Sequence, residues 1–159
     1  IKWPNDIQID GDKISGVIAE SRFQQYDSLC NVVVGIGLNI NLDPSVHDLL
    51  PDRTTSMKTL LNRDVDRLFT LNLLINHFDT LLQRLSNGES VVNEWKSYLN
   101  CIGEEITYSY LGTGKSPKYL KALVENVDSY GRLLLIDKSG SRYCVSAGDI
   151  RIINRLNIS

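Results

Sequence analysis

Cysteine, net charge and long apolar runs are all scarce in this sequence of 159 residues, and each shortage excludes a class of protein. Three cysteines, none of them in a CxxC pair, argue against a disulfide scaffold or a zinc site and predict a reduced, cytoplasmic protein without a metal site. A net charge of −2 gives no general attraction to nucleic acid or to an anionic membrane. Apolar runs such as 133–136 are as long as a strand and far too short to cross a bilayer.

The remaining composition is that of a folded domain. Hydrophobic residues make up 42% of the chain and charged residues 23%, which provides enough apolar surface for a buried core. The length fits one domain, or one domain with a small module. Ile1 stands first, in place of Met, and leads directly into a dense motif, which predicts that the chain is a fragment of a longer protein.

The opening stretch, residues 2–7, combines a cation, an indole, a rigid imino acid, an amide and a carboxylate. Pro4 favours an extended conformation for Trp3, and alternation would then place Lys2 and Pro4 on one side and Trp3 and Asn5 on the other. Two interpretations stay open from the residues alone. Either the lysine is directed into a pocket with the indole packed behind it, or it is solvated on an edge strand that then enters a turn.

Turn residues next predict a β-hairpin. A strand over 2–9 is followed by Asp10-Gly11, a dipeptide typical of tight hairpin turns, and by a return strand over 14–20. Gly16 lies inside the return strand, where a glycine marks either a bulge or a place that a ligand or another backbone approaches closely.

A second strand with glycines at its end follows a predicted loop over 23–28. The strand over 31–34 is rich in valine, as expected of a strand buried on both faces, and it leads into Gly35-Ile36-Gly37-Leu38-Asn39. The third glycine of a dinucleotide-binding fingerprint is missing, because Ile40 stands in its place, and we reject that interpretation. Close approach to a small ligand and tight packing without a ligand both remain open.

Two helices are predicted after a long connection over 42–59, whose length is typical of functional lids. Leucine, isoleucine and phenylalanine recur every three or four positions over 64–85, which predicts an amphipathic helix that stops at Asn87-Gly88. A shorter helix over 90–99 presents Trp95 as a core anchor. We expect both helices to pack on the sheet as scaffold, with His77 in a structural or surface role.

The pattern changes near Cys101 to five short strands, predicted over 105–110, 119–127, 132–136, 142–146 and 150–153. Short strands at this spacing, separated by turns that contain glycine, predict a small β-barrel. Residues 112–116 look like a phosphate-binding loop, but Ser109 stands where its first glycine belongs and Pro117 follows where a helix is needed. We therefore interpret this stretch as a hairpin tip.

Three of these motifs, in order and at a similar spacing, resemble the signature of the biotin–protein ligases: Lys2-Trp3-Pro4-Asn5-Asp6-Ile7, Lys13-Ile14-Ser15-Gly16-Val17 and Gly35-Ile36-Gly37-Leu38-Asn39-Ile40-Asn41. The carboxy-terminal strands resemble the SH3-like module of the same ligases, with Asp149 where many relatives carry Glu. The resemblance implies an α+β fold. Residues 1–101 would form part of a mixed sheet with helices, like that of class II aminoacyl-tRNA synthetases and biotin ligases, and residues 102–159 a small SH3-like β-barrel.

An enzyme of this family activates biotin with ATP and Mg²⁺ as biotinyl-5′-AMP and transfers it to a lysine of a biotin carboxyl carrier domain. The resemblance implies that Lys2 is the catalytic residue, in contact with both the biotin carboxylate and the α-phosphate. It further implies biotin binding by Gly16, Gly35, Ile36 and Gly37, and nucleotide binding by Asn5, Asp6 and Asn39. The family's loop rich in glycine and arginine is not found in these residues, so we expect the chain alone to be inactive.

Alternative functions remain open at this stage. A lipoate–protein ligase would share the fold, and a non-catalytic SH3-like binding module would share the carboxy-terminal strands. A ligase that also acts as a repressor would need a DNA-binding domain, on which these residues carry no information. The sequence also leaves open whether the protein forms a homodimer through a sheet edge, and which carboxylase supplies the carrier domain.

Overall fold

The computed structural model describes residues 1–24, 27–44, 53–111 and 117–153. Contacts between α-carbons divide the chain into two compact units, one of residues 5–87 and the other of residues 1–4 together with the chain from residue 88 onward. The chain therefore passes from one unit to the other between Pro4 and Asn5, inside the opening motif. The predicted division at residue 101 concerns domains of the ligase fold and stays a prediction.

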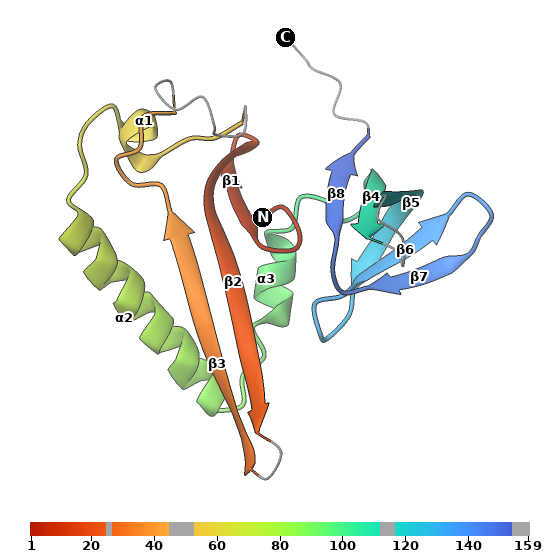
Figure 1. Ribbon diagram of the computed structural model, residues 1–159, viewed down its shortest axis with the longest axis horizontal. Helices are drawn as coiled ribbons and strands as arrows, with labels where there is room; N and C mark the ends of the chain where they lie inside the picture. Colours follow the sequence, from red (N-terminus) through yellow and green to blue (C-terminus); the bar gives the residue numbers. More distant parts are fainter. Residues whose placement is uncertain (25–26, 45–52, 112–116, 154–159) are drawn as a thin grey trace. The chain divides into compact units, whose positions relative to one another are not determined.

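The unit of residues 5–87 is built on a three-stranded antiparallel sheet in the order β1-β2-β3 (Figure 1). Its elements are β1 (Asp6–Ile9), β2 (Asp12–Gln24), β3 (Asp27–Leu38), α1 (Met57–Leu61) and α2 (Arg67–Ser86). The turn between β1 and β2 is the predicted one, since Asp10 and Gly11 both have positive φ, 52° and 88°, as tight hairpin turns of this kind require. β1 begins four residues later than predicted, because residues 3–5 form a turn.

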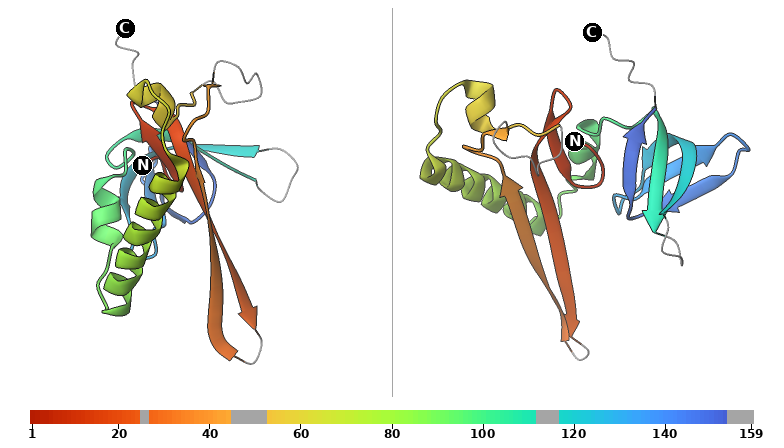
Figure 2. Two further views of the ribbon diagram at one scale, coloured as in Figure 1. Left: turned by 90° about the vertical axis from the view of Figure 1, so that its left-hand side faces the viewer. Right: turned by 45° about the horizontal axis from the view of Figure 1, so that its top comes forward.

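The hairpin of β2 and β3 is longer than predicted and continues through most of the stretch expected to be a loop over 23–28. Beyond the end of β1 it runs on as a two-stranded ribbon (Figures 1 and 2). The prediction that the strand over 31–34 is buried on both faces is wrong, because Val32 and Val33 are 57% and 69% exposed. A ribbon of two strands leaves its faces open unless a further layer covers them, and no described residue covers these valines.

Helix α2 confirms the predicted amphipathic helix and its stop at Asn87-Gly88, but it begins at Arg67, three residues later than predicted. The Asp66 carboxylate caps the first turn by accepting hydrogen bonds from the amides of Leu68 and Phe69, and the helix stops before Asn87. Its apolar side chains are largely exposed, and Thr70 is its only buried residue. The expectation that this helix buries its apolar face on the sheet is therefore wrong. No helix in the described ranges is both long and apolar enough to cross a membrane.

The second unit contains helix α3 (Val92–Ser97) and a five-stranded antiparallel sheet in the order β7-β6-β5-β4-β8. Its strands are β4 (Glu105–Leu111), β5 (Pro117–Val127), β6 (Leu133–Asp137), β7 (Arg142–Val145) and β8 (Asp149–Ile152). The short helix, the five strands and the mixed α and β composition are thus confirmed. Because β7 and β8 stand at opposite edges of the strand order, closure into an SH3-like barrel stays a prediction. The predicted hairpin tip at 112–116 lies outside the described residues.

The core of this unit is formed by alternate residues of the five strands. Its most completely buried members are Ile106, Val124, Leu133 and Leu135 of the strands, together with Cys101 before them. Trp3 joins the same core with only 1% of its surface exposed, and Trp95 of α3 packs against it. The prediction that Trp95 anchors a core is confirmed. Trp3 stands only three positions before Asp6, where strand β1 of the other unit begins, yet it is a core residue of the second unit.

Candidate functional site

Three glycines form a bare patch on one face of the three-stranded sheet. Gly16 of β2 lies directly opposite Gly37 of β3, and Gly35 lies opposite Ile18. Because side chains alternate along a strand, the three glycines share one face, and the side chain of Ile36 points to the other. A Cβ built at Gly35 or Gly37 would meet only a backbone oxygen of the opposite strand, at 3.8 Å. Tight packing therefore does not explain these two glycines, and the patch is open to a flat ligand.

An ion pair stands beside this glycine patch. Nζ of Lys13 lies 2.6 Å from Oδ1 of Asp6. A Cβ built at Gly16 would lie 3.3 Å from Nζ of Lys13 and 3.6 Å from Oδ1 of Asp6, so both charged groups adjoin that glycine. One cation and one anion are thus held next to exposed backbone, an arrangement suited to a ligand that carries both a ring and a charged group.

The segment after residue 52 holds the backbone of Lys13. The Lys13 amide donates to the carbonyl of Arg53, and the Lys13 carbonyl accepts from the amide of Thr55, both at 2.9 Å. Ser56, which is fully buried, then caps α1 with its side chain. The connection predicted over 42–59 therefore contains a braced segment and the start of a helix that the sequence did not predict, while residues 45–52 lie outside the described ranges.

The two asparagines predicted to bind nucleotide lie in the same unit as the glycine patch. Nδ2 of Asn5 donates to the carbonyl of Val17 at 2.8 Å, and Nδ2 of Asn39 donates to the carbonyl of Thr55 at 3.0 Å. Val17 is the residue after Gly16, and Asn39 lies two residues beyond Gly37. Both side chains are therefore oriented by backbone carbonyls of the unit that carries the patch.

Lys2, the predicted catalytic residue, belongs to the other unit. Its Nζ lies 2.8 Å from Oδ1 of Asp149, the first residue of β8, and the two side chains are 27% and 54% exposed. The sequence assigned no role to Lys13, although this residue opens the second matched motif and stands three positions before Gly16. A lysine this close to Gly16 in the same hairpin strand was the signal in the sequence that could have identified Lys13 as a site residue. The predicted contact of Lys2 with biotin stays a prediction.

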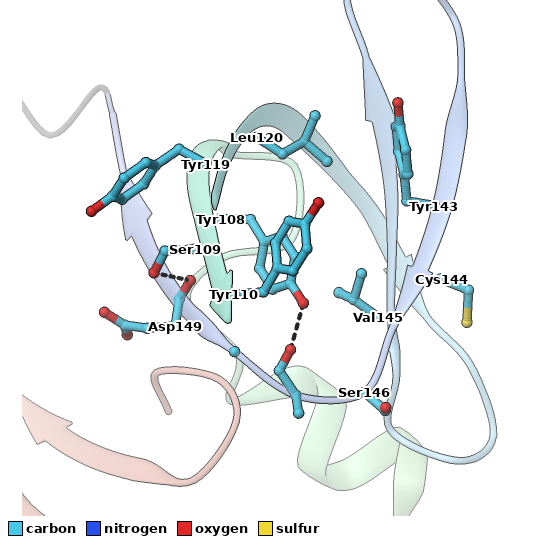
Figure 3. A pocket seen from close by; sticks show the side chains of 12 residues that line it. Tyr108, Ser109, Tyr110, Tyr119, Leu120, Tyr143, Cys144, Val145, Ser146 and Asp149 are labelled. Atoms are coloured by element: carbon cyan, nitrogen blue, oxygen red, sulfur yellow. Dashed lines mark hydrogen bonds between the residues drawn. The ribbon is translucent and has the colours of Figure 1, made fainter. Parts of the chain in front are cut away.

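A groove of about 870 Å³ lies on the five-stranded sheet, and no motif in the sequence pointed to it. Figure 3 shows its lining, in which the rings of Tyr108 and Tyr110 stack with their centroids 5.4 Å apart and Leu120 and Tyr143 stand around them. The Tyr108 hydroxyl donates to the carbonyl of Ala147 at 2.5 Å. Burial raises the pKa of Tyr108 above its ordinary value, which keeps this donor protonated.

Taken together, these elements define a mixed α/β protein, and the glycine patch with its ion pair is its candidate small-molecule site. Residues 1–39, which contain the first two matched motifs and the third as far as Asn39, match the model of the biotin/lipoate A/B protein ligase family. The chain is 31% identical over 150 residues to the bifunctional ligase/repressor BirA of Bacillus subtilis, covering 92% of this chain and 44% of the relative. It is 29% identical over 151 residues to a biotin--[acetyl-CoA-carboxylase] ligase of Mycobacterium tuberculosis, covering 94% and 52%.

Solved structures show the same fold. The apo biotin protein ligase of Aquifex aeolicus superposes with a TM-score of 0.74 at 22% identity, over 96% of this chain and 64% of that one. The same enzyme in complex with biotin and ATP gives a TM-score of 0.71 at 23% identity, over 95% and 60%. The chain spans about half the length of the curated relatives it matches. The predicted resemblance is confirmed: the chain is related to the biotin–protein ligases.

Proposed function

We propose that this protein is an ATP-dependent biotin–protein ligase. The observation that carries the proposal is the meeting of the matched motifs in one sheet, where Lys13 and Asp6 stand beside Gly16 and Gly16 faces Gly37. Sequence similarity to a bifunctional ligase/repressor over 92% of the chain, and to a biotin--[acetyl-CoA-carboxylase] ligase over 94% of it, supports the same conclusion.

The biotin ring, in this proposal, lies against the glycine patch. Gly16, Gly35 and Gly37 offer backbone without side chains, and Ile36 contributes through its backbone because its side chain points to the opposite face. A ureido ring with an apolar tail suits a site of this kind, which has few polar groups at defined places.

Adenylation is the first chemical step. An oxygen of the biotin carboxylate attacks the α-phosphorus of ATP, a new O–P bond forms, and the bond to the bridging oxygen breaks so that pyrophosphate leaves with its Mg²⁺. Two anions must approach each other, and a fixed cation beside both lowers the barrier. We assign this role to Lys13, oriented by Asp6, with Asn5 and Asn39 toward the nucleotide. Lys2 is the competing assignment from the sequence.

Transfer is the second step. The amine of a lysine in a biotin carboxyl carrier domain attacks the carbonyl carbon of the mixed anhydride, an amide forms, a proton is lost and AMP leaves. The carrier domain is therefore the proposed protein partner. The free thiols of Cys101 and Cys144 support the cytoplasmic location that we propose for this reaction.

The decisive test is biotin-dependent ATP–pyrophosphate exchange by the full-length protein, with lipoate as the control acid. We expect exchange with biotin only. Exchange with lipoate only would move the protein to the lipoate branch of its family, and no exchange with either acid from a folded protein would favour a binding module.

Two substitutions then separate the lysines. Lys13→Ala should lower the exchange rate by about 100- to 1000-fold, the usual effect of removing one group that stabilises transition-state charge. Lys58→Ala is the matched control, since that lysine also pairs with an aspartate, Asp64, at 2.8 Å. If Lys2→Ala abolishes exchange and Lys13→Ala does not, the assignment from the sequence is the right one.

A further inference from the structure

We propose that Asp149 is a positioning residue, which holds Lys2 and thereby ties the first residues of the opening motif to the five-stranded sheet. The pair joins side chains 147 residues apart, with Nζ of Lys2 at 2.8 Å from Oδ1 of Asp149. The inference rests on the proposed ligase function, because its effect is on the rate of adenylation.

The turn before Asp149 is locked against β4. Gly148 has a φ of +135°, and a Cβ at this position would overlap Cε2 of Tyr108 and lie 2.7 Å from the carbonyl oxygen of Ser109. The hydroxyl of Tyr108 donates to Ala147 at 2.5 Å, and Asp149 pairs with Ser109 in the β4–β8 ladder. In Figure 3 the Asp149 carboxylate points away from the stacked tyrosines. The carboxylate is therefore presented from a rigid base on the rim of the groove, which Asp149 helps to line.

The residues on both sides of Lys2 are anchored in the same unit. The carbonyl of Ile1 accepts a hydrogen bond from the amide of Asn100 at 3.0 Å, and Trp3 is buried with its Nε1 bonded to Gly131. An ion pair between exposed side chains is usually weak because both must be immobilised. Here the backbone around Lys2 and the backbone around Asp149 are already held in place, so forming the ion pair costs little additional entropy.

The Lys2–Asp149 ion pair affects the glycine patch through the continuous backbone. Pro4 is followed directly by Asn5 and Asp6, which bind the Val17 carbonyl and Lys13 beside the glycine patch. If the ion pair is lost, residues 1–4 become more mobile, and because the backbone is continuous, Asn5 and Asp6 are then held less precisely. Catalysis by positioning is sensitive to such displacement, because groups must be held within a fraction of an ångström of the reactive geometry.

The test measures biotin-dependent exchange by full-length variants, with kcat and KM for biotin and ATP, at a temperature where each variant is shown by its thermal melting to be folded. Asp149→Asn should lower kcat about fivefold, the size expected for a partly exposed ion pair. Asp149→Glu, which keeps the carboxylate, should recover most of the loss. Glu125→Gln is the control, because Glu125 pairs with Arg142 in the same sheet and should leave kcat unchanged.

The other outcomes overturn the inference. Unchanged kcat in Asp149→Asn would show that the pair does not act on the reaction. A loss that Asp149→Glu does not recover would show that the carboxylate of Asp149 does not act by holding Lys2. A loss that only follows the folded fraction would make the pair merely structural. If the wild-type protein itself shows no exchange, the ligase function fails first and the inference fails with it, which is distinct from an active wild type with an unaffected Asp149 variant.

Discussion

The indole Nε1 of Trp3 donates a hydrogen bond to the carbonyl oxygen of Gly131, 128 residues further along the chain, at 3.0 Å. The ring is 1% exposed within the core that the five-stranded sheet also supplies. Residues at the start of the chain and residues of the carboxy-terminal sheet are thus parts of one core. This relationship makes the opening motif a structural element as well as a candidate site.

Replacement of Trp3 should test that dual role. Trp3→Ala should lower the free energy of unfolding by about 3–5 kcal/mol, because it leaves a cavity the size of an indole. Trp3→Phe should cost less, since most of the ring volume is kept. Urea denaturation followed by circular dichroism measures both, with Tyr98→Ala, an exposed aromatic, as a control expected within about 0.5 kcal/mol of wild type. Equal stability of Trp3→Ala and Tyr98→Ala would contradict the burial of Trp3.

Gly148 should be far less tolerant of alanine than another glycine of positive φ. Gly148→Ala would force a methyl group against Tyr108 and Ser109 in addition to backbone strain, and we expect a loss of about 3 kcal/mol. Gly140 has a φ of +84° with nothing within 4 Å of a built Cβ, so Gly140→Ala should cost only about 1–2 kcal/mol of strain. Thermal denaturation of the two variants side by side decides the point, and a similar loss in both would mean that the turn before Asp149 is not locked.

Asp137 should make the stability of the small sheet depend on acid pH. Hydrogen bonds from Ser139 and from the hydroxyl of Tyr143 lower the pKa of its carboxyl from 3.8 to about 2. A group whose pKa is depressed in the folded state contributes fully above its unfolded pKa, and the contribution is lost as pH falls through the folded pKa. The free energy of unfolding should therefore fall more steeply in wild type than in Asp137→Asn between about pH 4 and about pH 2. Parallel curves for the two proteins would contradict the shift.

The open apolar surface of the unit of residues 5–87 should be detectable in the isolated chain. Leu68 and Phe69 at the start of α2 are exposed, as is Val33 of β3. Contiguous exposed apolar side chains bind hydrophobic dyes and promote association. We expect the 159-residue chain to enhance anilinonaphthalene sulfonate fluorescence, and Leu68→Gln/Phe69→Gln to reduce it. Tyr130→Ser, which removes an isolated exposed ring, serves as the control, and no dye binding by the wild-type chain would contradict the exposure.

The local sequence pattern was sufficient to predict the turns and helices whose formation depends mainly on neighbouring residues. Asp10-Gly11 predicted a hairpin turn that has positive φ at both residues, and the spacing of apolar residues over 64–85 predicted α2 with its stop before Asn87. The extent of burial was not predictable in the same way. A run of valines reads as a buried strand, but whether a layer covers it depends on residues distant in sequence, and the described ones leave Val32 and Val33 open.

What the sequence by itself determined is the set of chemical groups and the order of their motifs, which was enough to identify the relatives. Only the tertiary structure decided which groups meet. The sequence predicted that Lys2 lies in a strand over 2–9, but a turn at residues 3–5 interrupts that stretch. The lysine beside Gly16 is Lys13, which the β1–β2 hairpin brings there. The partner of Lys2 is Asp149, at a separation of 147 residues. Periodicity reports on neighbours a few residues apart, whereas such pairs depend on how whole elements pack, and no local pattern encodes that.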